Sequence, residues 1–337
     1  MAKRGWGPWS RIKLEALEDY LNAFARASSK TRTLYLDLFA GAPENFERGT
    51  GSVIANSGKR ALDVNPPINR VVLCEMQEKT ADNLESSLRS SYAGRDLVVL
   101  AEDCNVAIPR YLSQLSIDWR NYAAIFAMVD QYSAEISWKT LKYLSTYRRN
   151  KRGFKVGLWL YFGHGLLPRG LGRGDAPSES DEQRVREYAD RIDEMFGTKQ
   201  WRELWRARVD GALSGADFRG ELVNLMRWRL EHELGYCTTL PLEFTNENGN
   251  PIYTVIFATS NNIGEKIMSS VFNKHGDALQ KMRNAHKASK LLQKEEAQGV
   301  SSFFESEELT SLLTQQEVRE PLLPPIEPFR YPINPKP

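Results

Sequence analysis

The alternation of short apolar runs with amphipathic patterns is the feature that most constrains the fold of this 337-residue chain. Between most of these runs, apolar residues recur at helical spacing, as in 79–88 and 138–147. Strands that are buried on both faces and separated by helices form a parallel sheet with right-handed crossovers. The first half is therefore predicted to be an α/β sheet whose strands are 33–39, 70–74, 97–100, 122–129 and 156–162.

The second half has a different pattern. Ser180-Asp-Glu-Gln183 forms a capping box that opens a helix, and two further helices fit 200–209 and 217–234. Two strands then follow at 236–244 and 253–259, joined by a turn rich in Asn and Gly. We predict five parallel strands followed by a C-terminal antiparallel hairpin, with a helical insertion at about 165–215. This is the Rossmann-like sheet of class I methyltransferases.

Three regions are predicted along the chain. Residues 1–30 contain an N-terminal helix with apolar residues at helical spacing, and 31–275 form the methyltransferase-like domain. Residues 276–337 are predicted to be helical at first and then a flexible, proline-rich tail. Seven of the sixteen prolines lie between Pro321 and Pro337, where they exclude both a helix and a central strand.

Composition restricts the function only loosely. The net charge is +2, from 45 basic and 43 acidic residues, so charge alone does not indicate nucleic-acid binding. The three cysteines form no CxxC pair and, with the four histidines, never approach metal-ligand spacing, so we predict no metal site. The chain begins without the apolar segment of a signal peptide and has no apolar stretch long enough to span a bilayer. We expect a cytoplasmic protein that is not bound to a membrane.

The ends of the first two strands carry residues suited to a cofactor. Ligands of open α/β sheets bind beyond the carboxyl ends of the strands, where the strand order reverses. Asp37 and Gly41 follow the first strand, and a glycine there lets the backbone approach a ligand closely. Glu75 ends the second strand, where an acid can accept both hydroxyls of a ribose. Each of these acids, taken alone, is also consistent with an ordinary solvated residue of a loop.

The third strand adds another acid, Asp103, which could accept a hydrogen bond from an adenine amino group. Acids at three successive strand ends predict an adenosine-type pocket, and we expect S-adenosyl-L-methionine as its cofactor. The residues predicted to bind the cofactor are Asp37, Phe39, Gly41, Glu75, Met76, Asp103 and Cys104.

Asp130 and Tyr132 follow the fourth strand and are the predicted catalytic residues. Asp130 could orient or deprotonate a methyl acceptor, and Tyr132 could stack on a planar substrate. The alternative for Asp130 is a helix cap or loop acid. His164 follows the fifth strand and could reach the site, but a single histidine in a loop more often has no catalytic role. Arginines and tryptophans alternate in 201–208 and 227–229, which fits either a nucleic-acid surface or ordinary helix packing.

At these residues the chain resembles the three-Cys-motif partner proteins, a bacterial family with a methyltransferase-like fold. The matching segments cover about residues 10–275, and the last is the most family-specific. They are Tyr35-Leu-Asp-Leu-Phe-Ala-Gly41, Gly51-Ser52, Cys74-Glu75, Asp103-Cys-Asn105, Phe126-Ala-Met-Val-Asp130, Met195-Phe-Gly197 with Trp201, and 251–260 with 264–268. The resemblance implies a partner protein, radical-SAM-like and carrying the three-Cys motif.

The chain departs from that family at two loops. Gly41-Ala42-Pro43 stands where the family has Gly-Pro-Gly, and Asp130-Gln131-Tyr132-Ser133 stands where it has Asp-Pro-x-Gly. Pro43 fixes a φ angle that glycine would leave free. The family's C-terminal winged-helix region is replaced by the proline-rich tail.

Two functions follow from these patterns, together with a weaker third. The first is a methyltransferase that acts on nucleic acid or a modified-base intermediate together with a partner protein. The second is a methyltransferase-fold scaffold without turnover in a multiprotein, phage-defence-type system. An NAD-dependent oxidoreductase is less favoured, because the GxGxxG pattern is missing after Asp37. The sequence does not identify the methyl acceptor, the oligomeric state or the partner.

Overall fold

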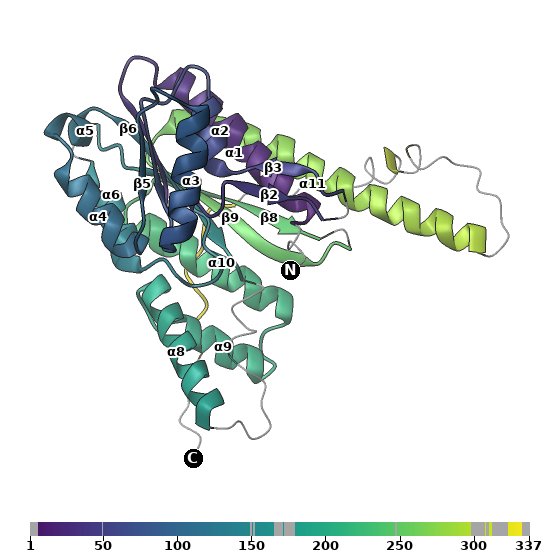
Figure 1. The fold of residues 1–337 in the computed structure, drawn as a ribbon. Helices are drawn as coiled ribbons and strands as arrows, with labels where there is room; N and C mark the ends of the chain where they lie inside the picture. Colours follow the sequence, from purple (N-terminus) through teal and green to yellow (C-terminus); the bar gives the residue numbers. More distant parts are fainter. Residues whose placement is uncertain are drawn as a thin grey trace.

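A computed structural model describes residues 6–48, 50–148, 150, 152–164, 171, 179–246, 248–297, 307, 310–311 and 323–331. A seven-stranded sheet in the order β5-β4-β1-β6-β7-β9-β8 forms its centre (Figure 1). β9 is antiparallel to both β7 and β8, and the other neighbouring pairs are parallel. The predicted sheet of five parallel strands and a C-terminal antiparallel hairpin is confirmed. The strands are β1 (Thr33–Asp37), β4 (Arg70–Cys74), β5 (Leu97–Leu100), β6 (Ala124–Val129), β7 (Gly157–Phe162), β8 (Thr238–Thr245) and β9 (Pro251–Thr259).

Helices cover both faces of the sheet. One face packs against α1 (Pro8–Ala27), α2 (Ser57–Asp63), α3 (Glu78–Ser91) and α11 (Asn262–Ala297). The other packs against α4 (Cys104–Gln114), α5 (Ile117–Asn121), α6 (Trp138–Tyr147), α8 (Glu179–Phe196), α9 (Trp201–Val209) and α10 (Gly215–His232). None of the helices in the described part of the chain combines the length and the apolar character of a membrane span.

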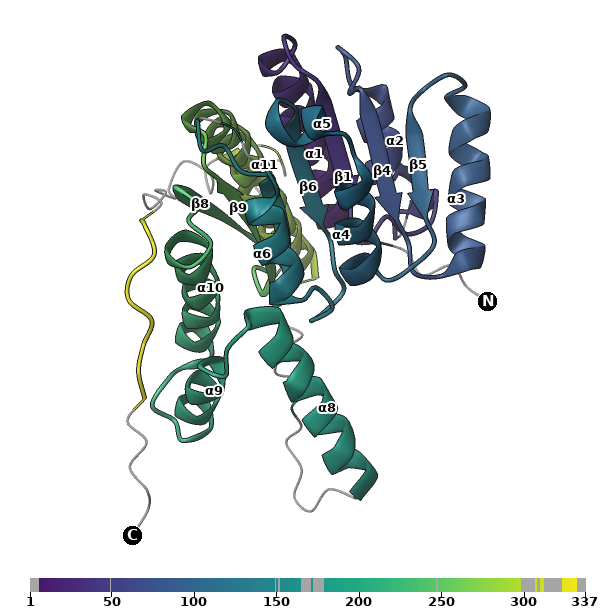
Figure 2. The ribbon, with the colours of Figure 1, turned by 90° about the vertical axis from the view of Figure 1, so that its left-hand side faces the viewer.

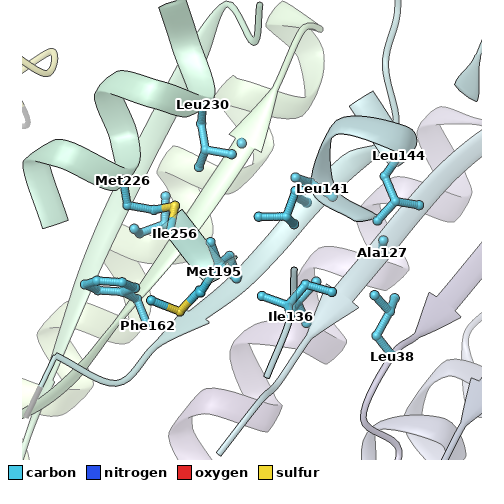
Figure 3. Close-up of a cluster of buried hydrophobic side chains, with 14 of the residues drawn as sticks. Leu38, Ala127, Ile136, Leu141, Leu144, Phe162, Met195, Met226, Leu230 and Ile256 are labelled. Atoms are coloured by element: carbon cyan, nitrogen blue, oxygen red, sulfur yellow. The ribbon is translucent and has the colours of Figure 1, made fainter. Parts of the chain in front are cut away.

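Successive side chains of each central strand enter opposite layers of the core. In β1, Leu34 and Leu36 pack with the α4–α6 layer, whereas Tyr35 packs with the α1–α2 layer. Because the layers on both sides are apolar, these strands read as continuous apolar runs. Figure 3 shows how α8 and α10 join this core, with Met195 and Met226 near Phe162 and with Leu230 farther along the same buried cluster.

A small hairpin separates β1 from the helix that follows it. It consists of β2 (Glu44–Phe46) and β3 (Val53–Ala55), two strands that were not predicted from the sequence. The N-terminal segment is bound to this hairpin, since the backbone N–H of Trp6 donates to Phe46 O and that of Arg48 donates to Trp6 O, both at 2.7 Å. The start of α1 is thereby held next to the loop that follows β1.

The helical insertion and the end of the chain lie together. Figure 2 shows α8 and α9 extending away from the sheet, with residues 323–331 alongside α10. The side-chain amide of Asn224 donates to Ile326 O and accepts from Ile326 N, both at 3.0 Å. The described part of the proline-rich tail is therefore extended, and it is packed against the domain.

Candidate cofactor and acceptor site

The strand order places a crevice next to β1. From β1 the chain proceeds to β4 and β5 on one side, and later to β6 and β7 on the other. The connections on the two sides diverge there, so the carboxyl ends of β1 and β6 border the position where α/β sheets bind ligands. The predicted residues Asp37 and Asp130 lie at or directly after these two strand ends.

Asp37 is completely buried between β1 and α2. Its carboxylate accepts hydrogen bonds from the Ser57 hydroxyl, from the backbone N–H of Phe39 at 3.1 Å and from the Tyr35 hydroxyl at 3.2 Å. Burial raises the pKa of Asp37 to about 6, although the hydrogen bonds from Ser57 and Phe39 partly offset this effect. Asp37 therefore lies beneath the loop that follows β1, and its hydrogen bonds fix the conformation of that loop.

Gly41 and Glu75 join the ends of β1 and β4. Gly41 has a φ of +66°, a left-handed conformation that favours glycine, and a Cβ there would meet nothing within 4 Å. Its backbone N–H donates to Glu75 Oε2 at 3.1 Å, and Glu75 Oε1 accepts from the backbone N–H of Gln77 at 2.9 Å. Each carboxylate oxygen can accept a further hydrogen bond, so the half-buried Glu75 remains able to bind a ligand hydroxyl.

The third strand end is more open. Asp103 is exposed and caps α4, because its Oδ1 accepts from the backbone N–H of Asn105 at 2.8 Å. Met76 is 69% exposed beside Glu75, whereas Cys104 is buried in the core beneath Asp103. Glu75, Met76 and Asp103 thus offer acceptors and an apolar surface at neighbouring strand ends, while the side chain of Cys104 packs in the core.

A cavity of about 130 Å³ lies between the β1 loop and α1. Phe39, Gly41 and Asp130 line it, and so do five residues that were not predicted to belong to the site: Trp6, Leu14, Asn45, Asn56 and Ser57. Asn56 and Ser57 belong to the start of α2, where Asn56 caps the helix by accepting from Lys59 N at 2.8 Å. Asparagine and serine directly before a helical segment are typical N-cap residues, and this pattern could have pointed to these two positions.

Asp130 is not a free carboxylate. The ammonium group of Lys13, from α1, is 2.7 Å from Asp130 Oδ1 and 2.5 Å from Oδ2. Lys13 is only 6% exposed, and its Nζ lies 5.5 to 5.8 Å from the ring centres of Trp6, Tyr161 and Tyr253. Aromatic faces attract a cation at such distances. No periodicity in the sequence indicated Lys13, because a lysine beside an apolar stripe normally reaches solvent.

Tyr132 lies apart from this ion pair. Its side chain is 69% exposed, and its backbone N–H donates to Glu135 Oε2 at 2.7 Å. The next residue back, Gln131, is buried; its Oε1 accepts from the backbone N–H groups of Glu135 and Ile136, both at 2.9 Å. Gln131 thus rigidifies the loop where the resembling family has a proline.

The basic and aromatic residues of the insertion serve mainly in packing. Trp201 is buried and donates to Asp193 at 2.8 Å, and Arg202 binds the same carboxylate. Arg227 and Arg229 are both at most 9% exposed. Of the two readings of this pattern, the structure favours helix packing over a nucleic-acid surface at these residues.

The residues at the three strand ends fit an adenosine group. Glu75 has unused acceptor sites, Asp103 is accessible, and the space beside Gly41 is open. The enclosed cavity is smaller than the roughly 300–1,000 Å³ of typical ligand pockets. Only part of S-adenosylmethionine could lie inside it, and the nucleoside would lie on the surface of Glu75, Met76 and Asp103. In the described part of the chain, no group of three or more His, Cys, Asp or Glu could hold a metal ion.

Strand order, switch point and flanking helices together define a Rossmann-like protein with the class I methyltransferase fold. Comparison with protein-family models gives no match, and comparison with curated proteins gives none either. Membership of the three-Cys-motif partner family is therefore not shown.

Several solved structures resemble the chain at low identity. The O-methyltransferase TomG from Streptomyces achromogenes, in complex with SAM, is 13% identical; the match covers 72% of this chain and 79% of that one, with a TM-score of 0.36. Magnesium protoporphyrin IX methyltransferase from Synechocystis PCC 6803, with bound SAH, is 13% identical over 74% and 84%, with a TM-score of 0.34. TYW2 from M. jannaschii, in complex with AdoMet, is 10% identical over 72% and 75%, with a TM-score of 0.30. With TM-scores below 0.5 these likenesses are loose, and the fold assignment rests on the strand order.

Proposed function

We propose that the protein binds S-adenosylmethionine and is a methyltransferase that acts on nucleic acid or a modified-base intermediate with a partner protein. The observation that carries the proposal is the hydrogen bond from Gly41 N–H to Glu75, which sets an acid and an open glycine loop side by side at the carboxyl ends of β1 and β4, next to the switch point. Glu75 would accept the ribose hydroxyls, and Asp103 would face the adenine. A three-Cys-motif protein remains the proposed partner.

The bound cofactor would supply a methyl group that is already electrophilic. The protein's own tasks are then to align the acceptor and to take up one proton. Asp130 borders the cavity next to Gly41, and its carboxylate is the group that we propose takes up that proton. In the present conformation Lys13 neutralises it, so the ion pair must loosen before Asp130 can act as a base.

Calorimetric titration of the full chain with S-adenosylmethionine, its demethylated product and NAD tests the cofactor proposal. We expect the first two to bind and NAD not to bind. Glu75→Ala removes charge-assisted hydrogen bonds of roughly 1.5–3 kcal/mol each, so affinity should fall about tenfold or more. Glu78→Ala, which removes an exposed acid from the nearby start of α3, is the matched control. Equal affinity of wild type and folded Glu75→Ala would place the ligand elsewhere.

One observation favours a second candidate, the scaffold without turnover in a phage-defence-type multiprotein system. The Lys13–Asp130 ion pair occupies the acceptor side of the crevice, and Pro43 adds stiffness to the adjoining loop. Transfer of tritiated methyl groups to pooled cellular DNA, RNA and protein separates the two candidates. An enzyme should label one pool, and Asp130→Asn should lower that rate by ~10²-fold or more while cofactor binding persists. A wild type that binds the cofactor and labels no pool supports the scaffold.

A further inference from the structure

A second and larger cavity lies between α10 and the β8–β9 hairpin. It measures about 470 Å³, within the range of small-molecule pockets, and it shares no lining residue with the cavity beside Gly41. The end of β7 contributes His164, the hairpin contributes Glu243 and Thr254, and α10 forms the opposite wall. The two cavities are therefore separate sites.

Small side chains on α10 keep this cavity open. Ala216 and Gly220 are four residues apart on the helix, so they lie on the same face, and both line the cavity. A Cβ placed on Gly220 would meet nothing within 4 Å. Glycine lowers helix stability by about 1 kcal/mol relative to alanine, and no tight packing or left-handed φ requires it at this position.

Two guanidinium groups lie on the same wall. Arg227 is 9% exposed, and its position is fixed because Nε donates to Thr239 Oγ1 at 3.0 Å while Nη2 donates to Thr239 O and Leu323 O. These contacts leave Nη1 without a partner among the residues that the structure describes. Arg219 makes no hydrogen bond or ion pair with any residue that the structure describes. Glu243, which is exposed, is the single acid among the described lining residues.

The hydrogen-bonding capacity of His164 is also only partly used. The ring is fully buried, Nε2 lies 3.0 Å from Thr254 Oγ1, and Nδ1 has no partner in the described part of the chain. Burial, together with the nearby charge of Arg219, lowers the pKa of His164 to about 4. The ring is thus neutral at pH 7, and the lining carries two positive charges against one negative charge.

We propose that this cavity binds a small organic anion whose phosphate or carboxylate group contacts Arg219 and Arg227. Guanidinium groups bind both oxyanions; Arg219 could do so through paired hydrogen bonds, and Arg227 through Nη1. Val223, Pro241 and Pro251 provide apolar contacts for the rest of the ligand. The inference does not depend on the proposed methyltransferase function, since its residues are different.

Calorimetry on the full chain at low salt tests the proposal, with phenyl phosphate, benzoate and benzyl alcohol as probes. At least one of the two anions should bind at least tenfold more tightly than the neutral alcohol, and the comparison between them shows which oxyanion is preferred. Arg219→Gln should weaken anion binding about tenfold or more, because it removes a charged donor. Arg206→Gln, at an exposed arginine of α9, should leave binding unchanged.

Gly220→Leu is the sharpest variant. Leucine favours helices and has open space here, so the melting temperature should not fall, whereas the side chain should fill the cavity and abolish anion binding. Glu75→Ala should bind the anions like wild type. Two results would overturn the proposal: failure of both anions to bind wild type, or undiminished binding by folded Gly220→Leu. Loss of S-adenosylmethionine binding alone would refute only the proposed function.

Discussion

At the scale of single residues, buried charge distinguishes this site. Asp37 is fully buried, and its pKa is raised to about 6. Lys13 and Asp130 form an ion pair in which the lysine is buried and the aspartate is partly buried. Asp37, Asp130 and Lys13 therefore lie close together beneath the β1 loop, and each should contribute measurably to the free energy of unfolding.

Asp37 should make stability fall as pH rises from about 4 to about 6. In that interval the native state holds a proton that the unfolded state has released, so its contribution is complete below pH 4 and lost as pH passes 6. A difference of about two pKa units corresponds to about 3 kcal/mol. Urea unfolding at several pH values should show that Asp37→Asn lacks this decline, while Asp82→Asn, at an exposed position, retains it. The same pH profile for Asp37→Asn and wild type would contradict the assignment.

The Lys13–Asp130 pair should behave as one unit. Lys13→Met leaves a part-buried carboxylate without its counterion and should lower the free energy of unfolding by about 3–5 kcal/mol, as should Asp130→Asn. The double variant removes both charges, so its loss should be clearly smaller than the sum of the single losses. Chemical denaturation of the four proteins completes the cycle. Additive losses would mean that the two residues do not interact.

At the scale of elements, helix α10 performs two roles. One face lines the anion cavity through Ala216 and Gly220. Asn224 and Arg227 belong to that wall and also bind the backbone of the tail, at Ile326 and Leu323. Any movement of the tail should therefore shift residues that line the cavity.

Asn224→Ala should release residues 323–331 from α10. It removes two hydrogen bonds of about 1 kcal/mol each, so the released population should rise roughly tenfold or more. Brief trypsin treatment and mass spectrometry should show cleavage after the exposed Arg330 accelerating by a similar factor. Gln183→Ala removes a hydrogen bond within α8 and should not change the rate. An unchanged rate in Asn224→Ala would mean that other contacts hold this segment.

At the scale of the whole molecule, two apolar layers enclose the sheet, and the cysteines report on them. Cys74 and Cys104 are buried in the same layer, while Cys237 is exposed. Burial raises the pKa of Cys74 to about 12 and that of Cys104 still further, so neither thiol ionises near neutral pH.

Thiol titration at pH 8 should therefore find one reactive group in the native protein and three in denaturant. Cys237→Ser should abolish the native reaction, which identifies the reactive thiol. The slow reaction of the remaining two should follow global unfolding, since Cys74 at the end of β4 and Cys104 at the start of α4 are buried in one core layer. Rapid labelling of Cys74 in the native protein would show that this layer opens locally.

The sequence by itself determined the sheet. Runs such as 122–129 and 156–162 are apolar on both faces, and only a strand covered by helices on both sides buries them fully. The same reasoning predicted that Asp37, Glu75 and Asp103 come at strand ends. Local patterns suffice for this, because strand position depends on residues that are neighbours in the chain.

Only the tertiary structure decided how these acids are used. Asp37 faces Ser57, Asp103 caps α4, and Asp130 meets Lys13, a residue 117 positions away in the sequence. Likewise, the cavity beside Gly220 exists because α10 and a distant hairpin approach each other without filling the space. Such contacts follow from long-range packing, which hydrophobic periodicity does not encode. Charge pairing and hollow spaces are therefore properties of the assembled fold.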